Sequence, residues 1–126
     1  MNASTPSALI LFAHGSRDSQ WRQPFESILA QVNSKNDQLA TLAFLECMMP
    51  SLPEAIDDMV AQGALQITVI PVFLAVGSHV RQDLPLLLEQ ARQKYPELRI
   101  HASAAIGEQP EIQAAIAQFA LKAATT

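Results

Sequence analysis

The chain has a single cysteine and no long run of apolar residues. Cys47 alone cannot form an intramolecular disulfide, and there is no cluster of cysteines that could hold zinc. The longest apolar stretch, residues 67–76, contains a proline and is far too short to cross a bilayer. The first six residues lack the charged and apolar regions of a signal peptide. We therefore expect a cytoplasmic protein that has no membrane partner.

Positive charge is scarce as well. Eight lysine and arginine residues stand against twelve acidic ones, for a net charge of −4, and they form no basic stripe. This pattern excludes the electrostatic footprint of a nucleic-acid-binding protein. With 49% hydrophobic and 16% charged residues, the composition is typical of a folded chain and not of a disordered one. A length of 126 residues predicts one domain over residues 1–126.

Four continuous apolar runs predict β-strands with helices on both faces of the sheet, because such strands do not alternate with polar residues. The runs are Ala8–Ala13, Ala40–Cys47, Gln66–Leu74 and Arg99–Ile106. Helical stretches follow them at Trp21–Ser34, from Ser51 to Gly63, at Asp83–Lys94 and from Pro110 onward. This alternation with short connections predicts an α/β fold, a three-layer αβα sandwich around a four-stranded, mainly parallel sheet.

Local signals mark several boundaries of these elements. Residues 51–54 have the pattern of a capping box, and Gly63 supplies a stop for the same helix. Pro71 would break a ladder bond in a central strand, so we expect it at an edge or a bulge. The fourth helix carries apolar residues at helical spacing, namely Ile112, Ala115, Ile116, Phe119 and Ala120.

Two histidines and a glutamate come at the predicted carboxyl ends of three strands. His14 closes the first apolar run, Glu46 lies near the end of the second, and His79 follows the third. In open parallel sheets, ligands bind outside the carboxyl ends of the strands. Two imidazoles and one carboxylate can ligate a borderline divalent metal and leave positions open for exchange. The sequence therefore predicts that both imidazoles face one crevice, with the carboxylate beside them.

Two motifs around these histidines resemble those of a known family. The His-Gly-Ser-Arg-Asp segment at residues 14–18 is similar to the opening motif of the CbiX-type sirohydrochlorin chelatases, which belong to the class II chelatases. Residues 73–85 follow their second motif, F-L-x-x-G-x-H-x-x-x-D-x-P. The resemblance covers essentially the whole chain, at the length of the family's short, single-domain form. The chain departs from many relatives near Gln109, where they carry a histidine.

The resemblance implies an enzyme that inserts a divalent metal into sirohydrochlorin on the way to cobalamin or sirohaem. The metal is then a substrate, with Co²⁺ as the first choice and Fe²⁺ or Ni²⁺ as alternatives, and no tightly bound cofactor is expected. His14 and His79 are expected to bind the metal or to accept the pyrrole protons. Glu46 is expected to support them as a carboxylate that raises imidazole basicity or takes a proton itself.

The same resemblance implies how the tetrapyrrole is held. Arg17 and Arg81 each follow a key histidine closely, and guanidinium groups bind carboxylates in a bidentate manner. Ser16 and Ser78, in two glycine–serine turns, are grouped with them as substrate-binding residues. One half-domain supplies only one wall of a tetrapyrrole-sized cleft, so a homodimer is expected to supply the second.

Other functions and other residues are weighed against this hypothesis. A non-catalytic metal- or tetrapyrrole-binding module is the alternative from another class. A histidine phosphatase needs an arginine just before the histidine, and here that residue is Ala13. Structural roles are expected for His101 at the surface and for Asp83 as a helix cap. Cys47 is expected to be buried, whereas Trp21 either covers the cleft or packs a helix.

Overall fold

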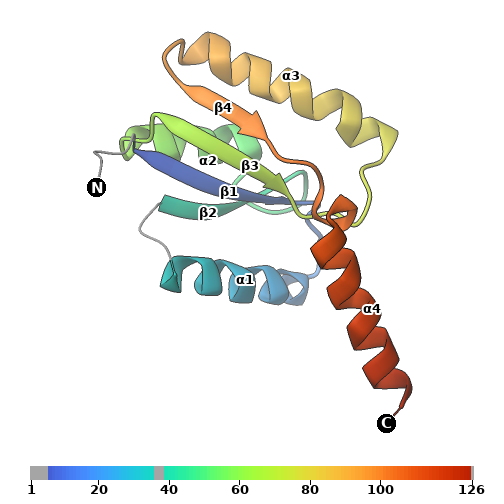
Figure 1. The fold of residues 1–126 in the computed structure, drawn as a ribbon. Coiled ribbons are helices and arrows are strands. Elements are labelled where there is room, and N and C mark those ends of the chain that lie inside the picture. The colour runs from blue at the N-terminus through green and yellow to red at the C-terminus, as the bar shows by residue number, and fades with distance from the viewer. Residues whose placement is uncertain (1–5, 36–38, 126) are drawn as a thin grey trace.

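The computed structural model describes residues 6–35 and 39–125 and has the α/β architecture that the sequence predicts. Four parallel strands lie in the order β2-β1-β3-β4 (Figure 1). These strands are β1 (Ser7–Ala13), β2 (Leu39–Phe44), β3 (Gln66–Pro71) and β4 (Arg99–Ala102). The helices are α1 (Gln23–Ser34), α2 (Leu52–Ala61), α3 (Ser78–Lys94) and α4 (Pro110–Ala124), with short 3₁₀ turns η1 (Ser19–Arg22) and η2 (Ile106–Glu108).

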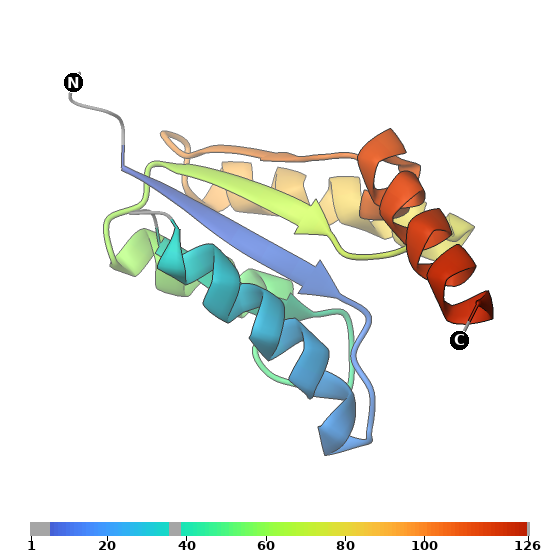
Figure 2. The same ribbon diagram turned by 60° about the horizontal axis from the view of Figure 1, so that its bottom comes forward.

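The helices cover the two faces of the sheet unequally. Figure 2 shows α1 in front of the sheet and both α2 and α3 behind it. The last helix, α4, lies beyond the carboxyl ends of β3 and β4 and points away from the sheet (Figure 1). One face is therefore covered by two helices of the same chain, and the other is covered only over β1 and β2.

The face under α2 and α3 carries the main hydrophobic core. Its buried residues include Ile10, Phe12, Leu52, Ile56, Ile67, Val69, Leu84 and Leu88. Because side chains alternate across a strand, every second residue of β1 and β3 contributes to this core. Burying a side chain of this size contributes about 1.5–3 kcal/mol. The predicted capping box is present, since Ser51 Oγ accepts from Glu54 N at 3.3 Å and Glu54 Oε1 accepts from Ser51 N at 2.9 Å.

A smaller cluster lies on the opposite face, under α1. It consists of the buried residues Leu11, Ala13, Leu42 and Phe44, with Trp21, Phe25 and Leu29 packed against them. The ring centroid of Trp21 is 4.4 Å from that of Phe25 and 6.3 Å from that of Phe44. Trp21 therefore packs η1 and α1 onto β2. Of the two roles considered from the sequence, covering the cleft or packing a helix, it has the second.

Several predicted boundaries are wrong, mostly at strand ends. The three predicted strands after the first end three or more residues too late, so Glu46 and Cys47 lie in the turn after β2. Cys47 is exposed with φ 68°, not buried, because the chain reverses here and Met48 N donates to Glu46 O at 2.8 Å. An extended strand would have pointed its side chain into the core.

The third helix begins at Ser78 rather than at Asp83, so Asp83 is not its cap. Gly77 takes the N-cap position without a side-chain cap, which leaves no local signal for the start. The helix continues through Pro85, which removes one backbone donor. Pro85 is exposed, so water can reach the carbonyl that loses this donor.

Pro71 is neither on an edge strand nor at a bulge, because β3 is an inner strand and Pro71 is its last residue. Val72 N donates to Phe12 O at 2.8 Å, so by alternation the nitrogen of Pro71 faces the side of β4. On that side Ser103 N still donates to Val69 O at 2.9 Å, one residue after β4 ends at Ala102. The next bond of this ladder would need an N–H at residue 71, so Pro71 ends the pairing of β3 with β4.

Candidate active site

His14 and Glu46 form a hydrogen-bonded pair at the carboxyl ends of β1 and β2. Parallel pairing continues past the strands, because Leu45 N donates to Ala13 O at 2.9 Å and Glu46 N donates to His14 O at 3.1 Å. The two side chains meet at 3.1 Å between His14 Nε2 and Glu46 Oε2. Both are more than half exposed, at 53% and 59%. The pair is thus fixed by the backbone and open to an incoming ligand.

Gly15 makes this close approach possible. Its φ is +97°, and a Cβ at this position would lie 1.9 Å from the carbonyl oxygen of Glu46. Any other residue would both strain the backbone and push the two strand ends apart. The glycine that follows His14 therefore has a physical reason, which is to let the Glu46 segment lie against the His14 segment.

Phe73 connects this pair to the end of β3. Its ring lies 6.4 Å from the imidazole of His14 and 5.9 Å from the ring of Phe12, both in edge-on geometry. Gly107 N donates to Phe73 O at 3.0 Å, and a Cβ on Gly107 would lie 1.8 Å from Leu74 O. The chain after β3 is therefore held from both sides, by β1 and by η2.

His79 lies in the first turn of α3 and pairs with Asp83 instead of with the residues around His14. Its Nε2 is 3.2 Å from Asp83 Oδ2, one helical turn along α3, and its side chain is 84% exposed. The spacing of four residues between the two was the sequence signal for this pair, and it was missed because Asp83 was assigned to a helix cap. The aromatic contact of Phe73 was not predicted either.

The structure thus brings the predicted site residues together as two pairs and not as one cluster. Within residues 6–35 and 39–125, no three His, Cys, Asp or Glu side chains lie close enough to hold one metal ion. Both pairs lie on segments that leave the carboxyl ends of strands, His14 directly after β1 and His79 after the loop from β3. Each histidine therefore offers its second ring nitrogen from a separate carboxylate-supported position.

The predicted substrate-binding residues differ in what they already contact. Arg17 is exposed, and in the part of the chain that the structure describes its guanidinium has no ion pair or hydrogen bond. Arg81 Nη2 donates to Val76 O at 2.8 Å, which braces the loop before α3. Ser16 Oγ accepts from Asp18 N at 3.0 Å, whereas Ser78 is exposed as the first residue of α3.

An apolar hollow of about 370 Å³ opens between the ends of β1 and β2, the start of α2 and the middle of α3. Phe12, Phe44 and Leu45 line it from the sheet, and Asp83 lines it from the helix. Leu45 precedes Glu46, and Asp83 is the partner of His79. The hollow therefore borders the His79 pair through Asp83, and His14 and Glu46 are not among its lining residues.

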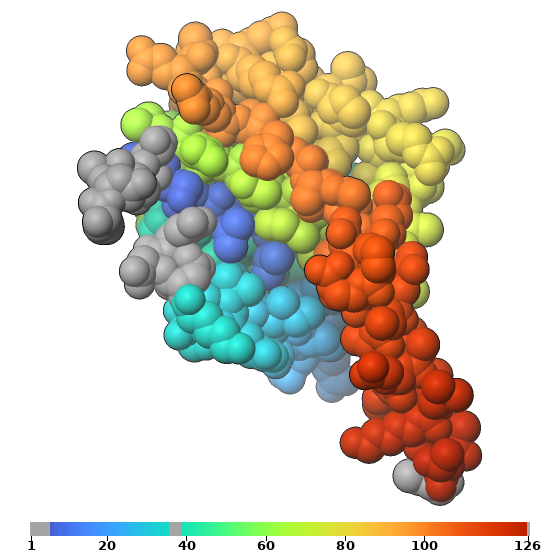
Figure 3. All heavy atoms as spheres, in the orientation of Figure 1, coloured from blue at the N-terminus to red at the C-terminus, as the bar shows by residue number. Residues whose placement is uncertain are grey.

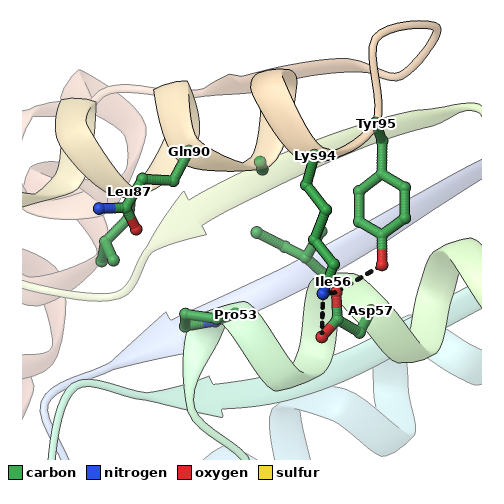
Figure 4. A pocket seen from close by; sticks show the side chains of 8 residues that line it. Pro53, Ile56, Asp57, Leu87, Gln90, Lys94 and Tyr95 are labelled. Atoms are coloured by element: carbon green, nitrogen blue, oxygen red, sulfur yellow. Dashed lines mark hydrogen bonds and ion pairs between the residues drawn. The ribbon is translucent and has the colours of Figure 1, made fainter.

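A third ionic group lies between α2 and α3, away from both pairs. Figure 4 shows Lys94 and Tyr95 reaching Asp57 across a cavity of about 130 Å³. Tyr95 Oη donates to Asp57 Oδ1 at 2.5 Å, and Lys94 Nζ donates to the same oxygen at 3.1 Å. These hydrogen bonds, first that of Tyr95 and then that of Lys94, hold the pKa of Asp57 below its usual range. They also raise the pKa values of Tyr95 and Lys94, so neither is activated for chemistry.

His101 is exposed on β4, as predicted, opposite Thr68 in the sheet register. Gln109 is half-buried at the N-cap of α4 and makes no side-chain cap. In the described parts of the chain, no helix is long and apolar enough to cross a membrane.

Comparison with known proteins shows which family the whole chain resembles. The model of the CbiX family matches residues 8–123. "Sirohydrochlorin cobaltochelatase" of Methanococcus aeolicus is 33% identical over 82 residues, which cover 64% of this chain and 57% of that protein. The match therefore spans little more than half the length of this curated relative.

Two solved structures are also similar. A CbiX protein of Marinobacter aquaeolei VT8 is 32% identical with a TM-score of 0.85, over 95% of this chain and 98% of that one. The sirohydrochlorin chelatase SirB from Bacillus subtilis subspecies spizizenii, in complex with cobalt, is 28% identical with a TM-score of 0.76. That match covers 85% of this chain but only 46% of SirB.

Proposed function

The chain belongs to the CbiX family, and on that premise we propose that it is a sirohydrochlorin chelatase that inserts a divalent metal, Co²⁺ first, into the macrocycle. The observation that carries the proposal is the His14–Glu46 pair, held open at the carboxyl ends of two neighbouring strands. His14 opens the motif at residues 14–18, and the family resemblance implies that His14 and Glu46 take part in the reaction. Cobalamin or sirohaem synthesis in the cytoplasm is the setting that we propose for it.

The chemistry needs a metal carrier and proton acceptors. When M²⁺ enters the ring, two pyrrole N–H protons leave, so charge and protons balance only if bases stand beside the ring nitrogens. A neutral imidazole accepts such a proton, and a carboxylate in contact with it stabilises the imidazolium that forms. His14 with Glu46 is suited to this task. His79 with Asp83 supplies a second imidazole for the metal or for the second proton.

Substrate anchoring is assigned to the arginines and serines of the two motifs. Sirohydrochlorin carries eight carboxylates, and the chain has a net charge of −4, so local cations have to offset the overall repulsion. Arg17 is the stronger candidate, because it is exposed and follows His14 by three residues in the sequence. Arg81 would have to leave Val76 O to reach a substrate carboxylate. Ser16 and Ser78 lie in the same two segments.

A homodimer is part of the proposal. This chain matches 46% of SirB and 98% of the Marinobacter protein, so SirB has about twice the length that one copy supplies. Two pairs that do not meet within one copy also favour a cleft with two walls. A closed twofold dimer is the commonest way to build such a cleft.

Incubation of the purified protein with sirohydrochlorin and Co²⁺, Fe²⁺ or Ni²⁺ tests the function. We expect metal insertion, followed by the visible spectrum, to be faster than in the protein-free control for at least one metal. Binding of the tetrapyrrole without faster insertion would reject the enzyme and support the binding module instead. Absence of both would reject the proposed function as a whole.

A further inference from the structure

The turn that carries Glu46 is formed by residues 45–50 and is anchored to several parts of the chain. Its first two residues are bonded to the end of β1 by the backbone hydrogen bonds described above. The turn closes where Phe44 N donates to Pro50 O at 2.9 Å. Within it, Met48 packs against the smaller cluster under α1. The place of the carboxylate beside the imidazole therefore depends on how firmly the whole turn is held.

Arg22, the last residue of η1, contacts this turn from outside with one guanidinium group. Its Nη1 donates to Met49 O at 2.9 Å, and its Nε donates to Glu26 Oε2 at 2.6 Å. Its Cζ lies 4.8 Å from the centroid of the Phe44 ring, at the base of the turn. The planar fork of a guanidinium group allows these contacts at the same time. Met49 is 65% exposed, so the turn is held here by a carbonyl group and not by a side chain.

The segment that places Arg22 is built by the opening motif. Ser16 Oγ accepts from Asp18 N at 3.0 Å, and Asp18 Oδ1 accepts from Gln20 N at 3.0 Å as the N-cap of η1. Figure 3 shows the atoms of α1 and its start at the surface, along the lower edge of the domain under the sheet. A short segment with its own hydrogen bonds thus connects His14 to Arg22.

These contacts close a ring around the candidate site. From His14 the chain passes through η1 to Arg22, which reaches across to the carbonyl of Met49. The turn then leads back to Glu46, whose carboxylate is 3.1 Å from the imidazole. An exposed pair of this kind holds little by itself. Its geometry is therefore set by the backbone, with Gly15 on one side of the ring and the guanidinium on the other.

We propose that Arg22 is a positioning residue for metal insertion, because it holds the turn so that Glu46 stays against His14. The inference rests on the proposed function, since it requires that this pair takes part in the reaction. Arg22 acts through the turn and not on the reacting atoms. A carboxylate that moves away no longer stabilises the imidazolium that forms when a pyrrole proton is accepted. Loss of the guanidinium should therefore slow the chemical step and leave binding of the tetrapyrrole unchanged.

The first test separates these two kinetic effects. Arg22→Gln should lower kcat of cobalt insertion by about tenfold or more, because a small displacement of a positioned group is costly. The KM for sirohydrochlorin should stay within about twofold. Arg92→Gln is the matched control, because Arg92 also donates to a backbone oxygen, Ile100 O at 2.7 Å, and pairs with Glu89. A kcat for Arg22→Gln equal to that of the control would overturn the proposal.

The second test asks whether the effect passes through the carboxylate. Two substitutions that act on the same interaction are not additive. In a Glu46→Gln background, Arg22→Gln should therefore change kcat by less than about twofold. A merely structural role would lower kcat by the same factor in both backgrounds. That result would overturn the proposal.

The third test observes the turn without substrate. Cys47 is the single cysteine, is exposed and follows Glu46 directly. A nitroxide attached to it should move faster in Arg22→Gln, seen as narrower lines in the electron paramagnetic resonance spectrum, and should be unchanged in Arg92→Gln. Equal mobility in both variants would overturn the proposal. If Arg22→Gln does not fold, Arg22→Lys takes its place with the same outcomes, since it keeps the charge over Phe44 but lacks the fork.

These readouts separate the positioning role from the proposed function. The spin label is measured without sirohydrochlorin or metal. If the unsubstituted chain inserts no metal, the proposed function fails, and the label still decides whether the guanidinium holds the turn. If the unsubstituted chain inserts metal but neither the label nor kcat responds to Arg22→Gln, the positioning role alone fails.

Discussion

The two histidine–carboxylate pairs are similar in chemistry and different in construction. His14 and Glu46 are 32 residues apart in sequence and meet because two parallel strand ends are joined by backbone hydrogen bonds. His79 and Asp83 are one helical turn apart on α3, and their contact needs nothing but the helix. The first pair is thus a product of the tertiary fold, and the second is a product of local periodicity.

The difference also concerns how firmly each pair is held. At the first pair, Gly15 brings the two backbones so close that a single methyl group would not fit. At the second pair, His79 is 84% and Asp83 44% exposed, against 53% and 59% at the first, so both side-chain contacts lie at the surface, and they differ in the backbone contact that supports the first. Surface pairs of this kind contribute about 0–1 kcal/mol. We therefore expect the His14 pair to be preorganised and the His79 pair to be set mainly by whatever binds there.

The largest expected effect is that of removing the imidazole at the preorganised pair. His14→Ala should lower the rate of cobalt insertion by about 10²–10⁴-fold, because it removes a positioned base. The initial rate from the visible spectrum measures this. His101→Ala is the matched control, since this histidine is exposed on β4 and outside both pairs. An insertion rate for His14→Ala equal to that of the control would show that this pair takes no part in the reaction.

Gly15→Ala tests whether the backbone contact, and not only the side chains, builds the first pair. The added Cβ would lie 1.9 Å from Glu46 O, so the strand ends must separate and Glu46 must leave His14. We expect insertion to slow by about tenfold or more and the free energy of unfolding to fall by about 1–3 kcal/mol. Denaturant unfolding and the insertion rate measure the two effects.

Gly63→Ala is the control for backbone strain alone. Gly63 also has a positive φ, +103°, but no atom lies within 4 Å of the position of its Cβ. This variant should lose stability by about 1–2 kcal/mol and keep its insertion rate. If both glycine variants lost activity equally, general destabilisation and not the Glu46 contact would explain the effect.

The sequence was informative wherever the signal was local or followed from parallel topology. Continuous apolar runs identified the four strands, and the capping box located the start of α2 where the structure has it. Glu46 was found because a carboxylate after an apolar run comes to the same sheet edge as His14. That inference needed only the rule that parallel strands share their carboxyl edge.

The remaining features depend on information that no single segment carries. The start of α3 was missed because Gly77 supplies no capping side chain, and Asp83 was predicted as the cap instead. For α4, the apolar spacing predicted a helix with a face to bury, but periodicity does not say against which surface. The two histidines belong to separate pairs because the segment that carries His79 continues away from the end of β3 into α3. The position of a residue near a strand end does not by itself predict this.

At the second pair, Asp83→Asn should have a much smaller effect than His14→Ala. Asparagine keeps an oxygen that can accept from His79 and loses only the charge of an exposed pair. A contribution of at most about 1 kcal/mol corresponds to less than about a fivefold change in the insertion rate. Glu89→Gln, which removes the charge of another exposed carboxylate on the same helix, is the control. A loss for Asp83→Asn as large as that for His14→Ala would mean that both pairs are equally preorganised.

The smallest effect is expected at Asp57, whose ionic contact lies outside the candidate active site. Folding lowers the pKa of Asp57 through Tyr95 and Lys94, so its contribution is full above its ordinary value of 3.8 and is lost as the pH falls through the lower folded value. Asp57→Asn should therefore lower the Tm slightly at about pH 7, and the difference should shrink at about pH 2.5, with no change in insertion rate. Asp58→Asn removes a neighbouring carboxylate that accepts a hydrogen bond from the nearby Gln62, and should change the Tm less. A difference for Asp57→Asn that grew toward low pH would contradict this sign. Such growth would mean that folding raises the pKa of Asp57, so that its surroundings between α2 and α3 destabilise the carboxylate instead of stabilising it.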